Sequence, residues 1–227
     1  IQGAQSSSFS IPDNQSLVGA SLRLLVTTTD PLSGQSSFVS DTLTVANSND
    51  DPLHNISIDG QTIEGSTLSV DLSSLTDQDG IPSSGLHSPT IQWLRNNNPI
   101  TGANSNSYTL SQDDVNNLIS VNISYTDQHG TPEQLSLTTA SNVQNIDNPA
   151  TATLQISGTP QEGNTLSASL SNLADPDGSP SPSFQWQTLH SDGSWNNIQG
   201  AHSSSFSIPD DQSLVGSSLR LLVTTTD

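Results

Sequence analysis

Short stretches in which apolar and polar residues alternate recur along the whole chain. Such alternation with a period of two is typical of half-buried strands, which place successive side chains on opposite faces. Clusters of Asp, Asn, Gly, Pro and Ser separate these stretches, and no helical stripe of useful length occurs. The pattern predicts an all-β fold, with strands within residues 21–29, 67–75, 118–126, 135–143 and 165–173.

The sequence repeats itself at two spacings. Glu64-Gly65 recurs as Glu162-Gly163, 98 residues later, and the motif at 77–80 (DQDG) recurs at the same offset as 175–178 (DPDG). Alternate units are nearly identical while neighbouring units have diverged, which indicates an array that grew by duplication of pairs. Residues 1–30 match residues 198–227 except at three positions, Gln5/His202, Asn14/Asp211 and Ala20/Ser217.

The spacing predicts tandem immunoglobulin-like or cadherin-like β-sandwich repeats of about 97 residues, arranged end to end. Residues 1–52 would be the C-terminal part of one repeat, 53–149 a complete repeat, and 150–227 the N-terminal part of a third that lacks its last strand. An alternative places the boundary near Ile1 and Ile198, so that both ends fold alone.

The aromatic residues fit a sandwich core. Trp93 and Trp186 follow "IQ" and "FQ" in the middle of predicted strands, where an immunoglobulin-like sandwich buries an aromatic side chain. Trp195 lies in a segment that the middle repeat lacks, so we expect packing with partial exposure. Phe9, Tyr108 and Phe206 occupy equivalent strand positions, and we expect all three in the core.

The composition of the chain disfavours several classes of partner and activity. A formal charge of −19 disfavours nucleic acid and anionic membranes as partners, but it suits hard cations, which take oxygen ligands. The absence of cysteine excludes disulfides and cysteine-based zinc sites. No run of apolar residues is long enough for membrane insertion, and no nucleophile motif occurs, so we expect no enzyme activity.

As an ensemble, the motifs EG-x-TL, L-x-D-x-DG, QW and VTTTD, joined by NDDP or DNP linkers, resemble the extender repeats of giant bacterial RTX adhesins. The glycine-rich calcium nonapeptides of that class are absent here. The resemblance implies a type I-secreted protein of the bacterial cell surface. It also implies a stalk, stiffened by calcium, that projects a terminal adhesive domain toward host cells, surfaces or a biofilm, with a role in virulence.

When the acidic residues are placed on a seven-strand sandwich, they cluster at its two ends, where successive repeats would meet. Crowded carboxylates repel one another unless a cation bridges them, and calcium accepts six to eight oxygens. We therefore expect calcium at the joints, as the cadherin-like resemblance also implies. The first joint would contain Asp13, Asp50, Asp51, Asp77, Asp79 and Asp127, and the second Glu64, Asp113, Asp114, Asp147, Asn148, Asp175, Asp177 and Asp227, with Glu162 equivalent to Glu64.

Two alternatives stay open at this point. The Asp-Gly and Asp-Pro pairs also suit turns without any metal, and Asp71, Asp192 and Glu133 read as solvated surface. Each repeat could instead be a carbohydrate- or protein-binding module rather than an extender.

The expected partners are neighbouring repeats of the same chain. A second copy of the chain is a further expected partner of the open third repeat, because an unpaired sheet edge is a template for strand addition. We expect residues 1–52 of one molecule to complete residues 150–227 of another, head to tail.

Overall fold

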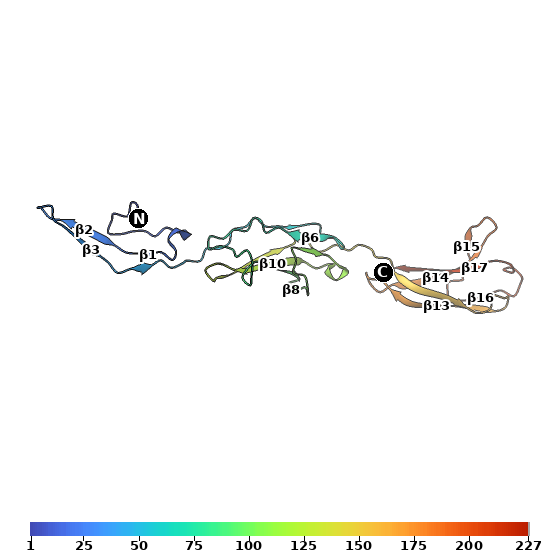
Figure 1. Ribbon diagram of the computed structural model, residues 1–227. Helices are drawn as coiled ribbons and strands as arrows, with labels where there is room; N and C mark the ends of the chain where they lie inside the picture. Colours follow the sequence, from blue (N-terminus) through green and yellow to red (C-terminus); the bar gives the residue numbers. More distant parts are fainter. Residues whose placement is uncertain (227) are drawn as a thin grey trace. The chain divides into compact units, whose positions relative to one another are not determined.

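The computed structural model describes residues 1–226, which contain many short antiparallel sheets and two single-turn 3₁₀ helices (Figure 1). The predicted all-β fold is confirmed. The chain divides into two compact units, residues 1–144 and 145–227. Residues 53–144 form the middle repeat within the first unit, and residues 145–226 are the described part of the C-terminal unit.

The N-terminal part of the first unit, residues 1–52, contains two narrow ladders. Strand β2 begins with Leu25-Val26 and strand β3 ends with Phe38-Val39, yet every residue of both strands is exposed, because no second sheet covers them within this segment. Strand β1 (Ser21–Leu22) pairs with β4 (Leu43–Thr44), β2 (Leu25–Thr29) pairs with β3 (Gln35–Val39), and helix η1 (Gln15–Leu17) precedes them.

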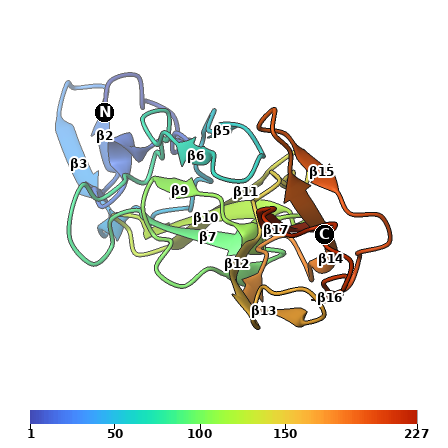
Figure 2. The same ribbon diagram turned by 90° about the vertical axis from the view of Figure 1, so that its right-hand side faces the viewer.

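The middle repeat has two sheets that share one core, as in a β-sandwich. The pattern of β10 shows why: its alternate residues Val121, Ile123 and Tyr125 are buried. Figure 2 shows β7 and β10 side by side, as their register requires. One sheet holds β5 (Ile58–Asp59), β6 (Thr67–Val70) and β9 (Ser107–Thr109); the other holds β11 (Pro132–Thr138), β10 (Ile119–Thr126), β7 (Thr90–Arg95) and β8 (Asn98–Pro99), with helix η2 (Gln112–Asp114) preceding β10.

The C-terminal unit repeats this order as far as β17. Each of its two sheets has three strands, and Trp186, Leu166 and Phe206 lie in the core between them. One sheet holds β12 (Thr151–Ser157), β13 (Thr165–Ala174) and β16 (Ser205–Ser207); the other holds β15 (Trp195–Asn197), β14 (Ser181–Leu189) and β17 (Leu219–Thr226).

Both expected core tryptophans are confirmed, since Trp93 and Trp186 are fully buried. Each indole N–H donates to a backbone oxygen, that of Ser105 at 2.9 Å and that of Ser203 at 3.0 Å. The preceding glutamine also repeats its role, because Gln92 Nε2 donates to Ile100 O and Gln185 Nε2 to Ile198 O, each directly after the next strand. The "QW" motif therefore satisfies buried polar groups in both copies.

A glycine in each repeat is required by the fold. Gly60 and Gly158 have φ of +123° and +106°, which side chains rarely adopt. A Cβ at either position would lie 2.5 Å from a backbone oxygen, that of Thr67 or of Thr165. These glycines let the first strand of a repeat approach the second closely.

Of the three other aromatic side chains expected in a core, Phe206 is buried and Tyr108 packs against the core of the middle repeat, but the expectation for Phe9 is wrong. Phe9 is 42 % exposed, because residues 1–52 lack the strands that cover the equivalent Phe206. Tyr108 is half-buried, and its hydroxyl leaves the apolar core to donate to Asp114 at 2.7 Å. Trp195 is partly exposed as expected, with the Arg220 guanidinium 4.3 Å from its ring centroid.

Candidate linker joints and cation sites

The first joint is built around the loop Asp77–Gly80, which lies between strands β6 and β7 of the middle repeat. Asp77 Oδ1 accepts from the backbone N–H of Asp79 at 2.8 Å, which closes an Asx turn. The hydroxyl of Tyr125 donates to Asp77 Oδ2 at 2.6 Å. Burial and this hydrogen bond to a carboxylate both raise the pKa of Tyr125.

Asp79 fastens the preceding linker to this loop. Its side chain is almost fully buried, and Oδ2 accepts from the backbone N–H of Asp50 at 2.7 Å. Its other oxygen accepts from Gln15 Nε2 at 2.5 Å. Gln15 Nε2 also contacts Asn47 Oδ1 at 3.1 Å, so helix η1, the linker and the middle repeat share one network.

Asp127 completes the same end of the middle repeat. The backbone N–H of Gln128 donates to Gly80 O at 3.1 Å, which places the two loops side by side. Gly80 has φ of +86°, and a Cβ there would meet the Gln128 side chain at 2.7 Å. The neighbouring strand ends therefore bring Asp77, Asp79 and Asp127 to one end of the sandwich.

The carboxylate of Asp127 is buried and one of its oxygens lacks a partner. Oδ1 accepts from the backbone N–H groups of His129 and Thr131, both at 2.8 Å. Burial favours the neutral form, but these backbone donors outweigh it and lower the pKa of Asp127. Oδ2, like Gln15 Oε1, is buried and has no hydrogen-bond partner within residues 1–226.

The same fastening recurs in the C-terminal unit. Asp177 N–H donates to Asp175 Oδ1 at 2.9 Å, and Asp177 Oδ2 accepts from the backbone N–H of Asn148 at 2.5 Å. Asp50 and Asn148 hold equivalent linker positions, as do Asp79 and Asp177. We call this contact the linker clamp: a linker N–H bound to the second aspartate of an Asp-x-Asp turn.

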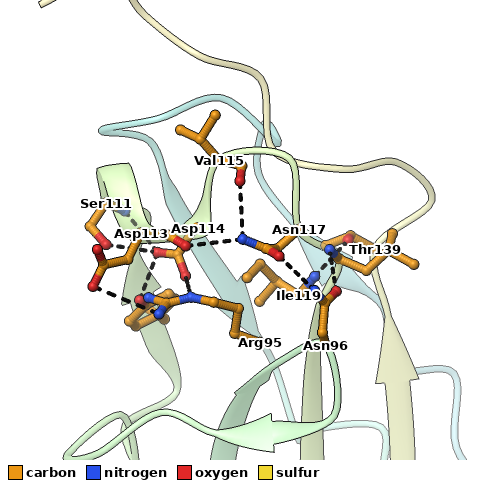
Figure 3. A network of polar contacts seen from close by, with 11 residues as sticks. Arg95, Asn96, Ser111, Asp113, Asp114, Val115, Asn117, Ile119 and Thr139 are labelled. Carbon is orange, nitrogen blue, oxygen red and sulfur yellow. Dashed lines mark hydrogen bonds and ion pairs between the residues drawn. The ribbon is translucent and has the colours of Figure 1, made fainter. Parts of the chain in front are cut away.

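Asp114 belongs to a different network, which faces strand β7 (Figure 3). Its side chain is fully buried. Oδ1 accepts from Arg95 Nε at 2.7 Å, and Oδ2 accepts from Tyr108 Oη, Ser111 N and Ser111 Oγ at 2.7, 2.8 and 3.0 Å. Burial opposes ionisation, but these donors outweigh it and lower the pKa of Asp114. Every one of these donors lies within the middle repeat.

The other expected ligands are spread more widely. Asp113 is exposed, 3.7 Å from Arg95 Nη1. Asp13 and Asp50 line one hollow of about 370 Å³, while Asp51 and Asp147 are exposed. The N–H of Glu64 donates to Gln144 O, and Glu162 Oε2 accepts from Gln212 Nε2. The second expected set is divided between the two units, with Glu64, Asp113 and Asp114 in the first and Asp147, Asn148, Asp175 and Asp177 in the second, and Asp227 lies outside the described residues.

The residues of the first joint offer calcium suitable donors but do not form a closed cage. No group of three or more His, Asp or Glu side chains is placed to hold a metal ion within residues 1–226. The orphaned oxygens of Asp127 and Gln15 are nevertheless the hard donors that calcium takes. The donor chemistry at this end fits a hard cation better than it fits a softer metal.

Sequence reasoning missed two residues of the first joint. Gln15 was not singled out, although Gln recurs at the same turn position as Gln112 and Gln212. Glu133 was expected to be solvated, but it is half-buried and accepts from Asn49 Nδ2 at 3.0 Å. Its partner lies in the linker, far away in sequence, so local patterning carried no signal for it.

No protein family model matches the chain, and no curated protein matches it either. The two described helices are single turns, so within residues 1–226 no helix could cross a membrane.

Proposed function

We propose that the chain is a spacer made of tandem β-sandwich repeats, a stalk segment of a bacterial surface adhesin. The observation that supports this most is the linker clamp, which occurs twice with equivalent residues. A linker that is hydrogen-bonded to the next repeat loses the freedom of an unattached one. A hydrogen bond to a charged group contributes about 1.5–3 kcal/mol, enough to hold a short linker in place.

Calcium is part of this function as a structural ligand. Asp127 Oδ2, Gln15 Oε1 and the carboxylate of Asp79 would hold the ion at the first joint. A divalent cation there supplies positive charge that offsets repulsion among the aspartates in a chain of formal charge −19. Secretion through a type I channel into a medium rich in calcium, with the chain folding outside the cell, is consistent with the absence of cysteine.

The aromatic residues favour a spacer over a sugar-binding module. Sugar sites on sandwiches need exposed rings for stacking, but Trp93 and Trp186 are fully buried. The Arg220 guanidinium occupies one face of the Trp195 ring. Carbohydrate binding by this chain on a glycan array would reverse this ranking.

Substitution of the clamp aspartates tests the proposal. Asp79→Ala and Asp177→Ala should increase linker proteolysis and backbone motion at residues 47–52 and 146–149, measured by NMR relaxation, while both cores stay folded. Asp71→Ala is the matched control, since Asp71 is exposed and accepts only from Ser73 within the described residues. Unchanged linker motion in both clamp variants would contradict the proposal.

Calcium titration tests the cation separately. Extracellular modules bind calcium at roughly 0.1–1 mM, and at about 100-fold excess one site adds about 2.7 kcal/mol. We expect calcium to raise the melting temperature, magnesium to do much less, and Asp127→Asn to remove the difference. A melting curve that a chelator leaves unchanged would exclude calcium and leave the clamp to be judged on its own variants.

A further inference from the structure

The sequence Asn-x-Ser occurs three times in the chain, at Asn14, Asn55 and Asn122. This sequence is the acceptor motif for N-glycosylation, in which the asparagine side chain carries a sugar on the molecular surface. The motif alone has little specificity in a chain rich in Asn and Ser. The structure, however, distinguishes the three asparagines by what their side chains contact.

The first asparagine has a structural role. Asn14 Oδ1 accepts from the backbone N–H of Ser16 at 3.0 Å and caps helix η1. Its counterpart Asp211 accepts from the backbone N–H of Ser213 at 3.1 Å, so the contact persists where the acceptor motif is absent. Capping therefore accounts for Asn14 without any sugar.

The third asparagine is held inside a sheet. Asn122 is half-buried in β10, which has β7 on one side and β11 on the other. Its backbone is paired with those of Gln92 and Ser136, and its Oδ1 accepts from Ser136 Oγ at 2.9 Å. A strand that is paired on both sides leaves no free edge at which an enzyme could bind the chain.

Asn55 has neither restraint. It is exposed, and within residues 1–226 no hydrogen bond engages its side-chain amide. Its backbone N–H donates to Ser74 Oγ at 3.3 Å, and Leu53 forms a bridge with Thr76. The segment leads into β5, the outermost strand of its sheet in the described part of the chain, beside β6 (Figure 2). The backbone is thus fixed on one side, while the amide is open to an enzyme.

An apolar side chain lies two residues before Asn55. Residues two apart share a face of an extended segment, and Leu53, Asn55 and Ser57 are all exposed, whereas Ile56 is buried. The exposed fraction of Leu53 is 67 %. A hexose carries C–H groups on its ring faces, so a sugar on Asn55 can cover Leu53 and remove apolar surface from water.

The C-terminal unit has neither the acceptor nor the leucine at this place. The positions equivalent to 53, 55 and 57 hold Thr151, Thr153 and Gln155. The exposed apolar residue and the acceptor motif therefore occur together in one repeat and are replaced together in the next. This joint replacement is what a sugar that packs on the leucine requires.

We propose that Asn55 is an N-glycosylation site and that its sugar covers Leu53 at the start of the middle repeat. In the transfer, Asn55 Nδ2 attacks the anomeric carbon of a hexose that is activated as a nucleoside diphosphate. The new N–C bond forms as the bond from that carbon to the diphosphate oxygen breaks. The nucleoside diphosphate leaves, and a base of the transferase takes the amide proton.

Peptide mapping of the protein from its own cells tests the modification directly. We expect an N-linked sugar on Asn55, and unmodified Asn14 and Asn122. An unmodified Asn55 in that protein would overturn the proposal.

Transfer in vitro tests the part that the fold plays. The folded full chain and synthetic peptides of residues 50–60 and 117–127 are incubated with UDP-glucose and a soluble N-glycosyltransferase that recognises the motif. Asn55 should react in the chain at nearly its peptide rate, and Asn122 at least about tenfold more slowly than in its peptide, because it must first open from the sheet. Ser57→Thr keeps the motif and should keep the transfer, whereas Ser57→Ala should abolish it. Equal reactivity of Asn55 and Asn122 in the folded chain would contradict the structural argument.

The contact with Leu53 has its own readout. One hexose on Asn55 should raise the melting temperature of the middle repeat by about 2–4 °C, and Leu53→Ser should remove this rise. Leu86→Ser is the matched control, since Leu86 is 98 % exposed in the loop before β7 and the rise should persist. A rise that survives Leu53→Ser would overturn the packing of the sugar on the leucine. None of these readouts depends on the spacer function, so either proposal can fail alone.

Discussion

The middle repeat and the C-terminal unit both build their core around a tryptophan, but the side chains beside that tryptophan are polar in the first and apolar in the second. In the middle repeat, Trp93 stacks on Tyr108 with ring centroids 6.0 Å apart, and Tyr108 donates to the buried Asp114. In the C-terminal unit, Trp186 stacks on Phe206 at 5.6 Å, and Leu214 packs against the core instead of an acid.

Three residues of this region differ together between the two units. Arg95, Tyr108 and Asp114 in the middle repeat correspond to Thr188, Phe206 and Leu214 in the C-terminal unit. A buried carboxylate is tolerated only when all its donors are present, and a phenylalanine needs no acceptor. Neighbouring repeats have thus reached two self-consistent solutions, one polar and one apolar, and mixing them should be costly.

Removal of the buried acid should have the largest effect. Asp114→Ala leaves the Arg95 guanidinium and the Tyr108 hydroxyl without their acceptor, which should cost about 3–5 kcal/mol of the middle repeat's unfolding free energy. Urea unfolding followed by the fluorescence of Trp93, in a chain whose other tryptophans are phenylalanine, measures it.

The control is the neighbouring residue. Asp113 is exposed and lies 3.7 Å from Arg95 Nη1, so Asp113→Ala should change stability by less than about 0.5 kcal/mol. Equal losses for the two variants would mean that burial of Asp114 is not what matters.

Truncation of the buried Val143 should have the next largest effect on stability. Val143→Ala removes a fully buried side chain and should cost the middle repeat about 2 kcal/mol. Val45→Ala in residues 1–52, where the side chain is half-buried, should cost clearly less in monomeric protein. Chemical unfolding of both variants at low concentration distinguishes them, and a larger loss for Val45→Ala would reverse the comparison.

Acid should destabilise the middle repeat more than the C-terminal unit. The loss of stability should be smaller than that caused by Asp114→Ala, because protonation leaves the other groups in place. The folded pKa of Asp114 is lowered, so its contribution to stability is complete above its unfolded pKa of about 3.9 and disappears as the pH falls through the folded value. Leu214 has no such dependence. The Trp93 signal should lose stability below about pH 4 more steeply than the Trp186 signal, and equal pH profiles would argue against this.

The strands and the core tryptophans could be predicted because their signal is local: alternation marks a half-buried strand wherever it occurs. The choice between Asp113 and Asp114 could not, since two adjacent acids in a turn look alike. It is decided by Arg95 and Tyr108, which β7 and β9 bring from distant positions.

Phe9 and Phe206 show the same limit more sharply. They lie in nearly identical 30-residue sequences, yet Phe9 is 42 % exposed and Phe206 is 9 % exposed. The difference comes entirely from β13 and β14, which cover Phe206 and have no counterpart in residues 1–52. Local sequence therefore predicted a buried strand residue at both positions, but only Phe206 lies in a strand, β16, and Phe9 lies in none.

The smallest net effect should come from exchanging the whole set. The triple variant Arg95→Thr, Tyr108→Phe, Asp114→Leu gives the middle repeat the residues of the C-terminal unit. Replacement of a buried ion pair by apolar side chains of suitable volume is often neutral or stabilising, so the triple variant should lie within about 1 kcal/mol of the original. The single variant Asp114→Leu should be far less stable, since it strands Arg95 and the Tyr108 hydroxyl. A cycle of single, double and triple variants, measured by urea unfolding, gives the coupling directly. If the losses of the single variants simply add in the triple variant, the three residues do not act as a set, and the alternation between repeats needs another explanation.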